Sequence, residues 1–267
     1  MSLSAIVITR NEEAMLPGCL KSLAFADEII VVDAESHDKT INIAQKYHAK
    51  IITVPADSDY SYSRNQGMKV AIGDWLLYID ADERVSQALR EEIKQVVKDR
   101  VFLQDPVLST SQALSYKIPR QNIMLGRWLK HGGFWPDTVH RLFSKNALIK
   151  WTGKLHESPT VRGEVKNIHH PLKHYTARTV RGALRKSSKW SQLEAGLLLK
   201  ANSPKVNGLK VLKAFNTKLF DVYIKRLGFL DGARGLILAF IQAQHQASVL
   251  VNLWQMQNKD SSSDRNP

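Results

Sequence analysis

Acidic side chains directly follow two of the most apolar runs in the sequence. Asp33 ends one of these runs, and Asp80 ends the other, with Asp82 and Glu83 close behind it. Carboxylates that gather in one place repel each other unless a cation lies among them. Mg²⁺ and Mn²⁺ suit such a site, because they are hard cations that prefer oxygen ligands and can hold two phosphates at once. The alternative is that these residues only end strands and cap helices, as Asp commonly does.

Short apolar runs alternate with helical patterns over about the first hundred residues. Strands are predicted at residues 4–9, 28–33, 49–55 and 75–80, and helices at 11–23, 36–47, 62–72 and 86–97. Asn11 and Ser86 are candidate N-caps of the first and last of these helices. The alternation favours an α/β fold with a parallel, doubly wound sheet, in which ligands bind at the carboxyl edge. Thr9, Asp33 and Asp80 would lie at that edge.

The sequence changes character twice beyond this alternation. Residues 101–175 are richer in Gly, Pro, Trp and His, with short predicted strands at 115–119, 139–143 and 147–151. Residues 176–267 are helical and basic, and the polar tail from residue 258 is expected to be disordered. We therefore predict three regions, at residues 1–100, 101–175 and 176–267.

Nearly all of the formal net charge of +13 lies in one region. Residues 160–235 contain 16 Lys and Arg against 4 Asp and Glu, which leaves the rest of the chain almost neutral. Such a region suits contact with a polyanion, which could be a nucleic acid, an acidic lipid or a phosphorylated acceptor. A solvated surface is the simpler alternative. No recognised nucleic-acid reader motif occurs, so no nucleic acid is expected as a partner.

Cysteine content and the N-terminal residues bear on the compartment. Cys19 is the only cysteine, which excludes an intramolecular disulfide and suits a reducing compartment. The first residues turn polar too soon for a signal peptide. Polar residues interrupt every run of about 18 residues, including the most apolar one at 236–254. We therefore expect a cytoplasmic protein without a membrane span.

Four short runs occur in a fixed order in the first hundred residues. They are Ile6-Val-Ile-Thr-Arg-Asn-Glu-Glu13, Asp27-Glu-Ile-Ile-Val-Val-Asp-Ala-Glu-Ser-His-Asp-Lys-Thr40, Arg64-Asn-Gln-Gly67 and Asp80-Ala-Asp82. An Asp-x-Asp alone is a weak signal, but the ordered set is specific and resembles family 2 glycosyltransferases. The resemblance implies a GT-A fold, which is a mostly parallel, Rossmann-like sheet. It also implies a UDP-sugar donor and a divalent metal, with residues 1–100 binding the donor and 101–175 binding the acceptor.

The resemblance assigns donor-site residues by position. Six would line the donor nucleotide: Thr9, Asn11, Glu12, Asp33, Arg64 and Asp80. The Asp33 carboxylate would accept the N3–H of uracil. Arg64 would lie near the diphosphate, which suits its chemistry, and Asp80 would approach the ribose or the metal. Asp82 would ligate the metal, with His174 as a further ligand or as a donor to the diphosphate.

Direct displacement at a sugar carbon needs a base that accepts the proton of the acceptor hydroxyl. Glu157 in Trp151-Thr-Gly-Lys-Leu-His-Glu157 is the candidate, and His156 could orient it. Together with residues 132–143, this stretch resembles bacterial lipopolysaccharide core β-1,4-glucosyltransferases, which act on inner-core heptose. The resemblance implies inversion at the anomeric carbon and transfer of glucose. The alternative for Glu157 is a surface carboxylate paired with a nearby lysine.

The basic region contains an amphipathic helical pattern. Its apolar residues recur at helical spacing: Leu209, Leu212, Phe215, Leu219, Val222 and Tyr223. Such a helix could lie in the headgroup layer of an anionic membrane or pack on the catalytic domain. A lipid-linked phosphorylated glycan acceptor at the cytoplasmic face of the inner membrane would account for the charge and the amphipathicity. A polyprenyl-phosphate, capsule or protein acceptor stays open, and a nucleic-acid-binding protein is a more distant alternative.

Overall fold

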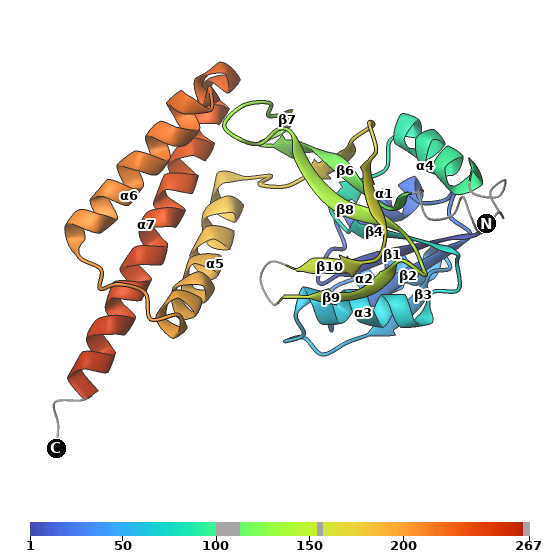
Figure 1. Ribbon diagram of the computed structural model, residues 1–267, viewed down its shortest axis with the longest axis horizontal. Coiled ribbons are helices and arrows are strands. Elements are labelled where there is room, and N and C mark those ends of the chain that lie inside the picture. The colour runs from blue at the N-terminus through green and yellow to red at the C-terminus, as the bar shows by residue number, and fades with distance from the viewer. Residues whose placement is uncertain (100–112, 154–156, 264–267) are drawn as a thin grey trace. The chain divides into compact units, whose positions relative to one another are not determined.

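The computed structural model describes residues 1–99, 113–153 and 157–263. The chain divides into two compact units. The sheet unit comprises residues 1–121 and 137–174, and the helical unit comprises residues 122–136 and 175–267. Nearly all of the strands lie in the first unit, and the two longest helices lie in the second (Figure 1).

Four parallel strands form the core of the sheet unit, in the order β3-β2-β1-β4. β1 (Leu3–Thr9) pairs with β2 (Glu28–Asp33) on one side and with β4 (Trp75–Asp80) on the other, and β3 (Lys50–Thr53) lies outside β2. Both faces of the central strands are buried, which explains why their sequences are continuous apolar runs. The predicted parallel, doubly wound arrangement is confirmed.

The sheet continues beyond β4 in the order β8-β6-β12-β5, with β7 and β11 also paired to β6 and a separate ribbon of β9 and β10. β8 is antiparallel to both β4 and β6, whereas β11 is parallel to β6. Their bounds are β5 (Glu83–Arg84), β6 (Ala113–Met124), β7 (Arg127–Trp128), β8 (Asp137–Ser144), β9 (Leu148–Thr152), β10 (Ser158–Val161), β11 (Glu164–Asn167) and β12 (Leu172–Tyr175). The strands predicted after residue 100 correspond to β6, β8 and β9. The second half of the sequence therefore completes the sheet begun by the first half.

Helices cover both faces of the parallel strands. Their bounds are α1 (Leu16–Ser22), α2 (Thr40–Lys46), α3 (Tyr60–Val70) and α4 (Gln87–Asp99). α1 and α4 bury Leu20 and Leu89 in the same cluster as Val7 of β1. α3 packs on the other face, where Gly67 lies so close to Ile6 that an added Cβ would be 2.5 Å from the Ile6 Cγ2 atom.

The first helix begins later than predicted. α1 starts at Leu16, with Pro17 in its first turn, and Asn11 does not cap it. Asn11 has a left-handed φ of 53°, and its side-chain oxygen accepts the His37 N–H at 2.8 Å. The residues between β1 and α1 are therefore a loop that is tied to the loop after β2.

Side-chain caps set the start of two other helices. Asp59 accepts the Tyr62 N–H at 2.7 Å, so α3 begins two residues earlier than predicted. Ser86 accepts the Leu89 N–H at 3.2 Å, which confirms it as the cap of α4.

Three long helices dominate the helical unit: α5 (Val180–Lys200), α6 (Gly208–Phe220) and α7 (Gly232–Ser263). A π-helical turn, η3 (Asp221–Lys225), and a 3-10 turn, η4 (Gly228–Asp231), join α6 to α7. α7 packs along both α5 and α6 (Figure 1). The predicted C-terminal helical region is confirmed.

The polar tail is more ordered than predicted, because α7 continues to Ser263. Gln257 anchors its last turns to the loop between α5 and α6. The Val206 N–H donates to Gln257 Oε1 at 3.0 Å, and Gln257 Nε2 donates to the Ser203 carbonyl at 3.1 Å. Residues 264–267, the rest of the predicted disordered tail, lie outside the described residues.

One helical stretch among the described residues, Gly228–Asn258, is long and apolar enough to cross a membrane by length and composition alone. The mean hydropathy of its most apolar 18-residue window is 1.3, and a third of that window is buried in the helical unit. Leu238, Ile241 and Leu253 are among the buried residues. Packing against the neighbouring helices therefore accounts for part of the apolar character of this stretch. From the sequence, the same stretch was expected not to span a membrane, because polar residues interrupt it.

Candidate active site

The strand register brings three of the predicted residues to the carboxyl edge of the parallel strands. Thr9 ends β1 opposite Asp33 at the end of β2, and Asp80 at the end of β4 lies opposite Ile8. Successive side chains alternate between the two faces of a sheet. Asp33 therefore shares the face of Thr9, and Asp80 shares the face of Ile8. The predicted residues form two groups at one edge, on opposite faces of the sheet.

The group around Asp33 joins the loops that follow β1 and β2. Asp33 is fully buried, and its two carboxylate oxygens accept the Ser36 hydroxyl and N–H at 2.5 and 2.8 Å. The Asn11 N–H donates to Ser36 Oγ at 2.7 Å, and the Glu12 N–H donates to Thr40 Oγ1 at 2.8 Å. Three of the predicted nucleotide-binding residues, Asn11, Glu12 and Asp33, are thus held beside one another by the β2–α2 loop.

Thr9 differs from its neighbours in this group. Its Oγ1 atom is buried and has no hydrogen-bond partner within the part of the chain that the structure describes. A buried hydroxyl without a partner costs free energy. The Thr9 hydroxyl therefore has unused hydrogen-bonding capacity at this edge.

Two arginines neutralise Asp80 on the other face. Arg64 Nη2 donates to Asp80 Oδ1 at 3.0 Å, and Arg141 Nη2 donates to Asp80 Oδ2. Burial alone would raise the pKa of Asp80, but the charges of Arg141 and Arg64 outweigh it and lower this pKa well below its usual range. The cations beside Asp80 are arginines, so the repulsion that indicated a metal there is already relieved.

Arg141 also holds Glu83, which is fully buried. Glu83 Oε1 accepts from Arg141 Nη2 at 2.8 Å, and Glu83 Oε2 accepts the Asp80 N–H at 2.9 Å. Burial alone would lower the pKa of Arg141, but the charges of Asp80 and Glu83 raise it, so the guanidinium stays charged. Arg141 was not among the residues predicted from the sequence to form the site. The sequence feature that could have identified it is a charged residue inside a short predicted strand, directly before Leu142 and Phe143.

Arg64 joins Asp80 to the predicted base. Its Nη2 atom also donates to Glu157 Oε1 at 3.1 Å. The rings of Trp151 and Tyr78 lie against the guanidinium, with centroids 4.8 and 5.8 Å from its central carbon. Among the described residues, the partner of Glu157 is therefore a buried arginine; Lys154, the nearest lysine in the sequence, lies outside them. Three residues that were predicted separately, Arg64, Asp80 and Glu157, lie together.

The run Arg64-Asn-Gln-Gly67 has a structural basis in these contacts. Asn65 Nδ2 donates to the Trp151 carbonyl, and the Trp151 N–H donates to Asn65 Oδ1, both at 2.9 Å. These two bonds fix β9 to α3, so the Trp151 ring lies over Arg64. Gly67 allows α3 to lie close to the sheet, which places Arg64 beside Asp80.

Asp82 and His174, the two predicted metal ligands, are adjacent. His174 Nε2 lies 3.4 Å from Asp82 Oδ2, because β12 pairs with β5 and places His174 opposite Glu83. Neighbouring ligand atoms on an octahedral ion lie about 3 Å apart, so one ion could contact both. The described residues contain no group of three metal-ligating side chains. The pair therefore fits Mg²⁺ or Mn²⁺ only if substrate phosphate oxygens complete the shell.

Tyr60, which the sequence analysis did not select, lies near the same charges. Burial and the negative charges of Asp80 and Glu157 raise the pKa of its phenol. Tyr60 begins α3, and about half of its side chain is exposed. Its protonated hydroxyl could donate a hydrogen bond to a ligand beside Glu157. His156, the predicted orienting residue for Glu157, lies outside the described residues.

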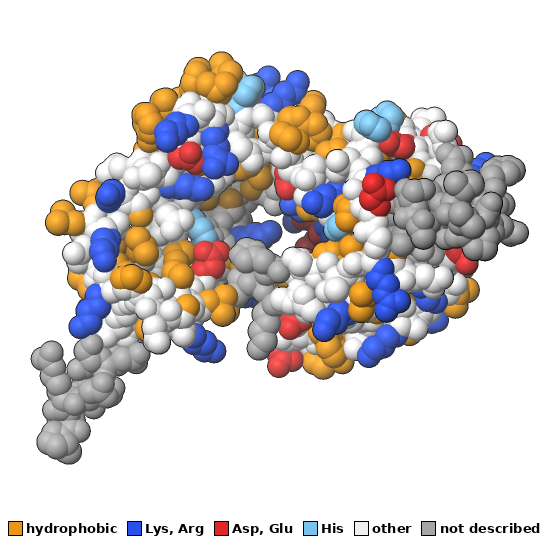
Figure 2. All heavy atoms as spheres, viewed as in Figure 1, with side chains coloured by type: hydrophobic (Ala, Val, Ile, Leu, Met, Phe, Trp, Pro, Cys, Tyr) orange, Lys and Arg blue, Asp and Glu red, His pale blue; other side chains and the backbone are white. Residues whose placement is uncertain are grey.

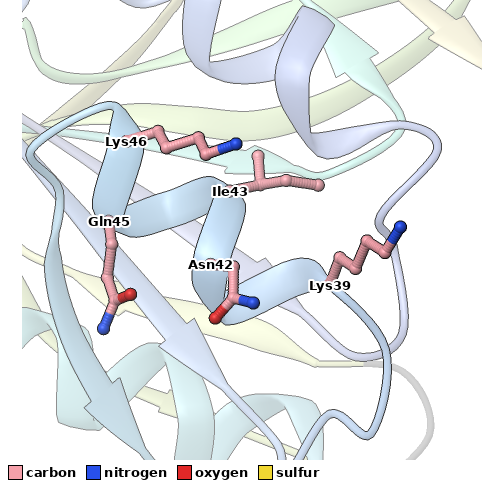
Figure 3. Close-up of a pocket in the computed structure, with 5 residues that line it drawn as sticks. All are labelled: Lys39, Asn42, Ile43, Gln45 and Lys46. Carbon is pink, nitrogen blue, oxygen red and sulfur yellow. The ribbon is translucent and has the colours of Figure 1, made fainter.

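A surface hollow lies elsewhere on the sheet unit (Figure 3). Its lining comes from α2 and the residue before it: Lys39, Asn42, Ile43, Gln45 and Lys46. None of the predicted site residues contributes to it. The candidate active site is therefore the carboxyl edge with its arginine-held carboxylates, and not this hollow.

A sequence profile described as "Glycosyl transferase family 2" matches residues 4–153, which include both groups at the carboxyl edge. The chain belongs to this family. It is therefore a glycosyltransferase, and its sheet unit has the GT-A fold that the sequence analysis expected of family 2.

The similarity of this family 2 enzyme to its relatives covers most of its length. It is 26% identical to an uncharacterized glycosyltransferase of Rickettsia felis over 90% of this chain and 85% of the relative. It is 24% identical to the lipopolysaccharide core biosynthesis glycosyltransferase LpsC of Rhizobium meliloti over 91% of each. Among solved structures, S. aureus TarS 1–349 in complex with UDP-GlcNAc has a TM-score of 0.49 at 16% identity, with 98% of this chain and 92% of that chain covered. Family membership follows from the profile match.

Proposed function

We propose that this glycosyltransferase moves a hexose, glucose in our proposal, from a UDP-sugar to an inner-core heptose of lipopolysaccharide, with inversion at the anomeric carbon. The observation that carries the proposal is the shared arginine: Arg64 holds Glu157 beside Asp80, next to the Asp82–His174 pair. This arrangement puts a carboxylate base next to groups suited to a nucleotide diphosphate.

The donor would bind across the carboxyl edge. Asp33 would face the uracil, and the unpartnered Thr9 hydroxyl would bond the nucleotide. The loop residues Asn11 and Glu12 would close over it from the positions in which the β2–α2 loop holds them. Binding would require at least one Asp33 oxygen to exchange its bond to Ser36 for the N3–H of the base.

Asp82 and His174 would hold the divalent cation together with the diphosphate. When bound, such a cation stabilises the charge that develops on the departing diphosphate. Asp82 contributes an anionic oxygen, and His174 contributes a ring nitrogen that the β12–β5 pairing fixes. Asp80, whose oxygens already accept from two arginines, would instead orient Arg64.

Glu157 would accept the proton of the acceptor hydroxyl as that oxygen attacks the anomeric carbon. The guanidinium of Arg64 limits where the Glu157 carboxylate can lie, which is how a protein positions a base before reaction. One carboxylate that acts as a base, without a second that acts as a nucleophile, suits a single displacement and therefore inversion.

The acceptor class is supported by the relative LpsC, whose name gives a role in lipopolysaccharide core biosynthesis and which aligns over nearly its full length. A lipid-linked, phosphorylated acceptor also suits the basic helical unit. We accordingly place the enzyme at the cytoplasmic face of the inner membrane, in peripheral contact with anionic lipid. A polyprenyl-phosphate, capsule or protein acceptor would use the same donor site.

A transfer assay with purified protein tests the proposal. The protein is incubated with Mn²⁺, one UDP-sugar at a time, and truncated lipopolysaccharide that ends in inner-core heptose, and the product is read by mass. We expect a hexose increment with UDP-glucose that chelation of the metal abolishes. An increment that appears only with a polyprenyl-phosphate, capsule or protein acceptor would replace the proposed acceptor. If the protein neither hydrolyses nor transfers any UDP-sugar, the assignment of a UDP-sugar donor would be overturned.

A further inference from the structure

Helix α6 carries two apolar rows, although packing in its own unit needs only one. The inner row, which includes Phe215 and Val222, faces the rest of the helical unit. Val222 is 1% exposed, and the ring of Phe215 contacts that of Phe240 on α7 at 5.4 Å. The sequence pattern merged this inner row with residues that point elsewhere, such as Leu209 and Leu212.

The outer row of α6 is unpartnered within the described residues. It comprises residues that share one side of the helix and of η3: Leu209, Leu212, Phe220, Ile224 and Leu227. Leu209 is 77% exposed, Leu212 is 59% exposed and Phe220 is 54% exposed. Aliphatic and aromatic side chains this open, on one side of a helix, indicate a surface that meets an apolar environment, although Lys213 and Asn216 lie among them.

Exposed apolar side chains also occur on η4 and at the start of α7, which contact η3 and each other. Phe229, Leu230 and Leu236 are exposed there, as is much of Phe240. We call the outer row and these four residues the apolar face. Figure 2 shows hydrophobic and basic side chains interspersed over the helical unit. Apolar side chains with basic residues between them are the pattern of a surface that lies in a lipid interface.

Charge identifies the partner. The helical unit contains 17 Lys and Arg against 5 Asp and Glu. Three of its acids are already paired inside the unit: Asp221 with Arg226, Asp231 with His131, and Glu194 with His245. Lys210 and Lys213 lie on α6 itself, between residues of the outer row. The apolar face therefore stands in a strongly positive field that its own unit does not neutralise.

We propose that the apolar face inserts into the headgroup–acyl boundary of an anionic bilayer, with Lys210, Lys213 and their neighbours on lipid phosphates. This deepens the proposed function, since it rests on the membrane-bound acceptor named above and assigns the surface that meets that membrane. A second copy of the chain is a poorer occupant, because a two-fold contact would bring the same lysines against each other.

Vesicle flotation with the full chain tests this assignment. The probes are vesicles of phosphatidylcholine alone and of equal parts phosphatidylcholine and phosphatidylglycerol. We expect binding to the mixed vesicles, little binding to the neutral ones, and release of most of the protein by alkaline carbonate, as for a peripheral protein. Retention after carbonate would show a spanning helix and overturn interfacial insertion.

Matched variants locate the surface. The triple variant Leu209→Ser, Leu212→Ser, Ile224→Ser loses three apolar anchors. Its affinity for mixed vesicles is expected to fall by at least roughly tenfold. The control Ile72→Ser, Ile149→Ser removes exposed apolar residues of the sheet unit and should bind as the unchanged protein does. Lys210→Gln, Lys213→Gln should weaken binding by about fivefold per charge removed.

Three further readouts separate the possible failures. Circular dichroism and transfer to a lipid-free heptose acceptor should be unchanged in the triple variant, since its residues are exposed. If that variant binds vesicles as well as the unchanged protein does, the assignment of the apolar face as the membrane-binding surface would be overturned, even if transfer succeeds. Failure of the unchanged protein to act on any acceptor would instead count against the proposed function. If the protein is a dimer in lipid-free solution and the triple substitution makes it monomeric, the apolar face would be assigned to a second copy of the chain.

Discussion

Asp80 lies between two arginines that are almost fully buried, and one of them also binds Glu83. The acidic run Asp80-Ala-Asp-Glu83 could be read from the sequence as a cluster in need of a cation. The identity of that cation could not be read from the sequence, because Arg64 lies in the preceding helix and Arg141 lies 61 residues away. Only the pairing of β8 with β4 brings Arg141 to this edge.

Arg141→Met should destabilise the fold strongly, because it leaves Asp80 and Glu83 buried with one cation fewer. Breaking a buried ion pair from one side costs about 3–5 kcal/mol. Urea unfolding followed by circular dichroism measures this change. Arg120→Met, which removes a partly exposed arginine 3.8 Å from Glu83, is the control and should cost much less. A loss below about 1 kcal/mol in Arg141→Met would contradict the role given to this residue.

Asp82→Ala and His174→Ala should each weaken the binding of UDP in the presence of Mn²⁺, because each removes one of the two proposed protein ligands. Loss of a metal ligand should reduce affinity by at least roughly tenfold. Calorimetry of UDP binding, with and without Mn²⁺, measures the effect. Asp57→Ala changes an exposed carboxylate that has no proposed role in metal binding, and it serves as the control. Equal UDP affinity in all four proteins would remove the metal assignment.

His140 should make the stability of the fold depend on pH. Burial, together with the charge of Lys117, lowers the pKa of His140 to about 4. The unfolded chain therefore binds a proton on this histidine below its ordinary pKa of about 6.5, while the folded chain does not. The free energy of unfolding should fall as the pH is lowered from about 6.5 to 4, by at most about 1.4 kcal/mol per pH unit.

Urea unfolding at several pH values in this window measures the His140 contribution. His140→Gln has no titrating ring and should flatten the dependence. If the two proteins lose stability in parallel, other groups cause the loss.

At the scale of elements, the parallel strands were predictable because their two buried faces leave no polar alternation in the sequence. The start of α1 was not predictable from the sequence. Asn11 resembles a helix cap locally, but it bonds His37 from the next loop, and that partner follows from the tertiary structure. The ends of the strands were therefore predictable, whereas the conformation of the loops that carry the donor-site residues was not.

Gly67→Ala should destabilise the protein by about 1–3 kcal/mol, because the added Cβ would lie 2.5 Å from Ile6 Cγ2 and force α3 away from the sheet. The matched control is Gly196→Ala on α5, where a Cβ meets nothing within 4 Å. The control should gain up to about 1 kcal/mol from helix propensity. Thermal unfolding of both variants measures the difference, and equal shifts in Tm would show that α3 is not packed as described.

At the scale of the whole molecule, the charge divides between the two units. The helical unit carries 17 Lys and Arg against 5 Asp and Glu, whereas the sheet unit, with 21 against 20, is almost neutral. The sequence predicted a basic region from its charge run. It did not predict that residues 122–136 join that region, because this segment comes from the middle of the chain and associates with the helical unit through tertiary contacts such as that of His131 with Asp231 of η4.

The donor and acceptor halves predicted at residues 1–100 and 101–175 also meet in the sheet unit. Glu157 from the second half shares Arg64 with Asp80 from the first. The proposed catalysis depends on this meeting of the two halves, so a single measurement on Glu157 tests it.

Glu157→Gln keeps the size of the side chain and a hydrogen-bond acceptor for Arg64, but removes the base. Calorimetry of UDP binding and the mass-based transfer assay, performed on the same preparation, should show unchanged affinity for UDP and a fall in transfer of at least about a hundredfold. Transfer at the rate of the unchanged protein would contradict the account, because the proton of the acceptor would then leave by way of another group.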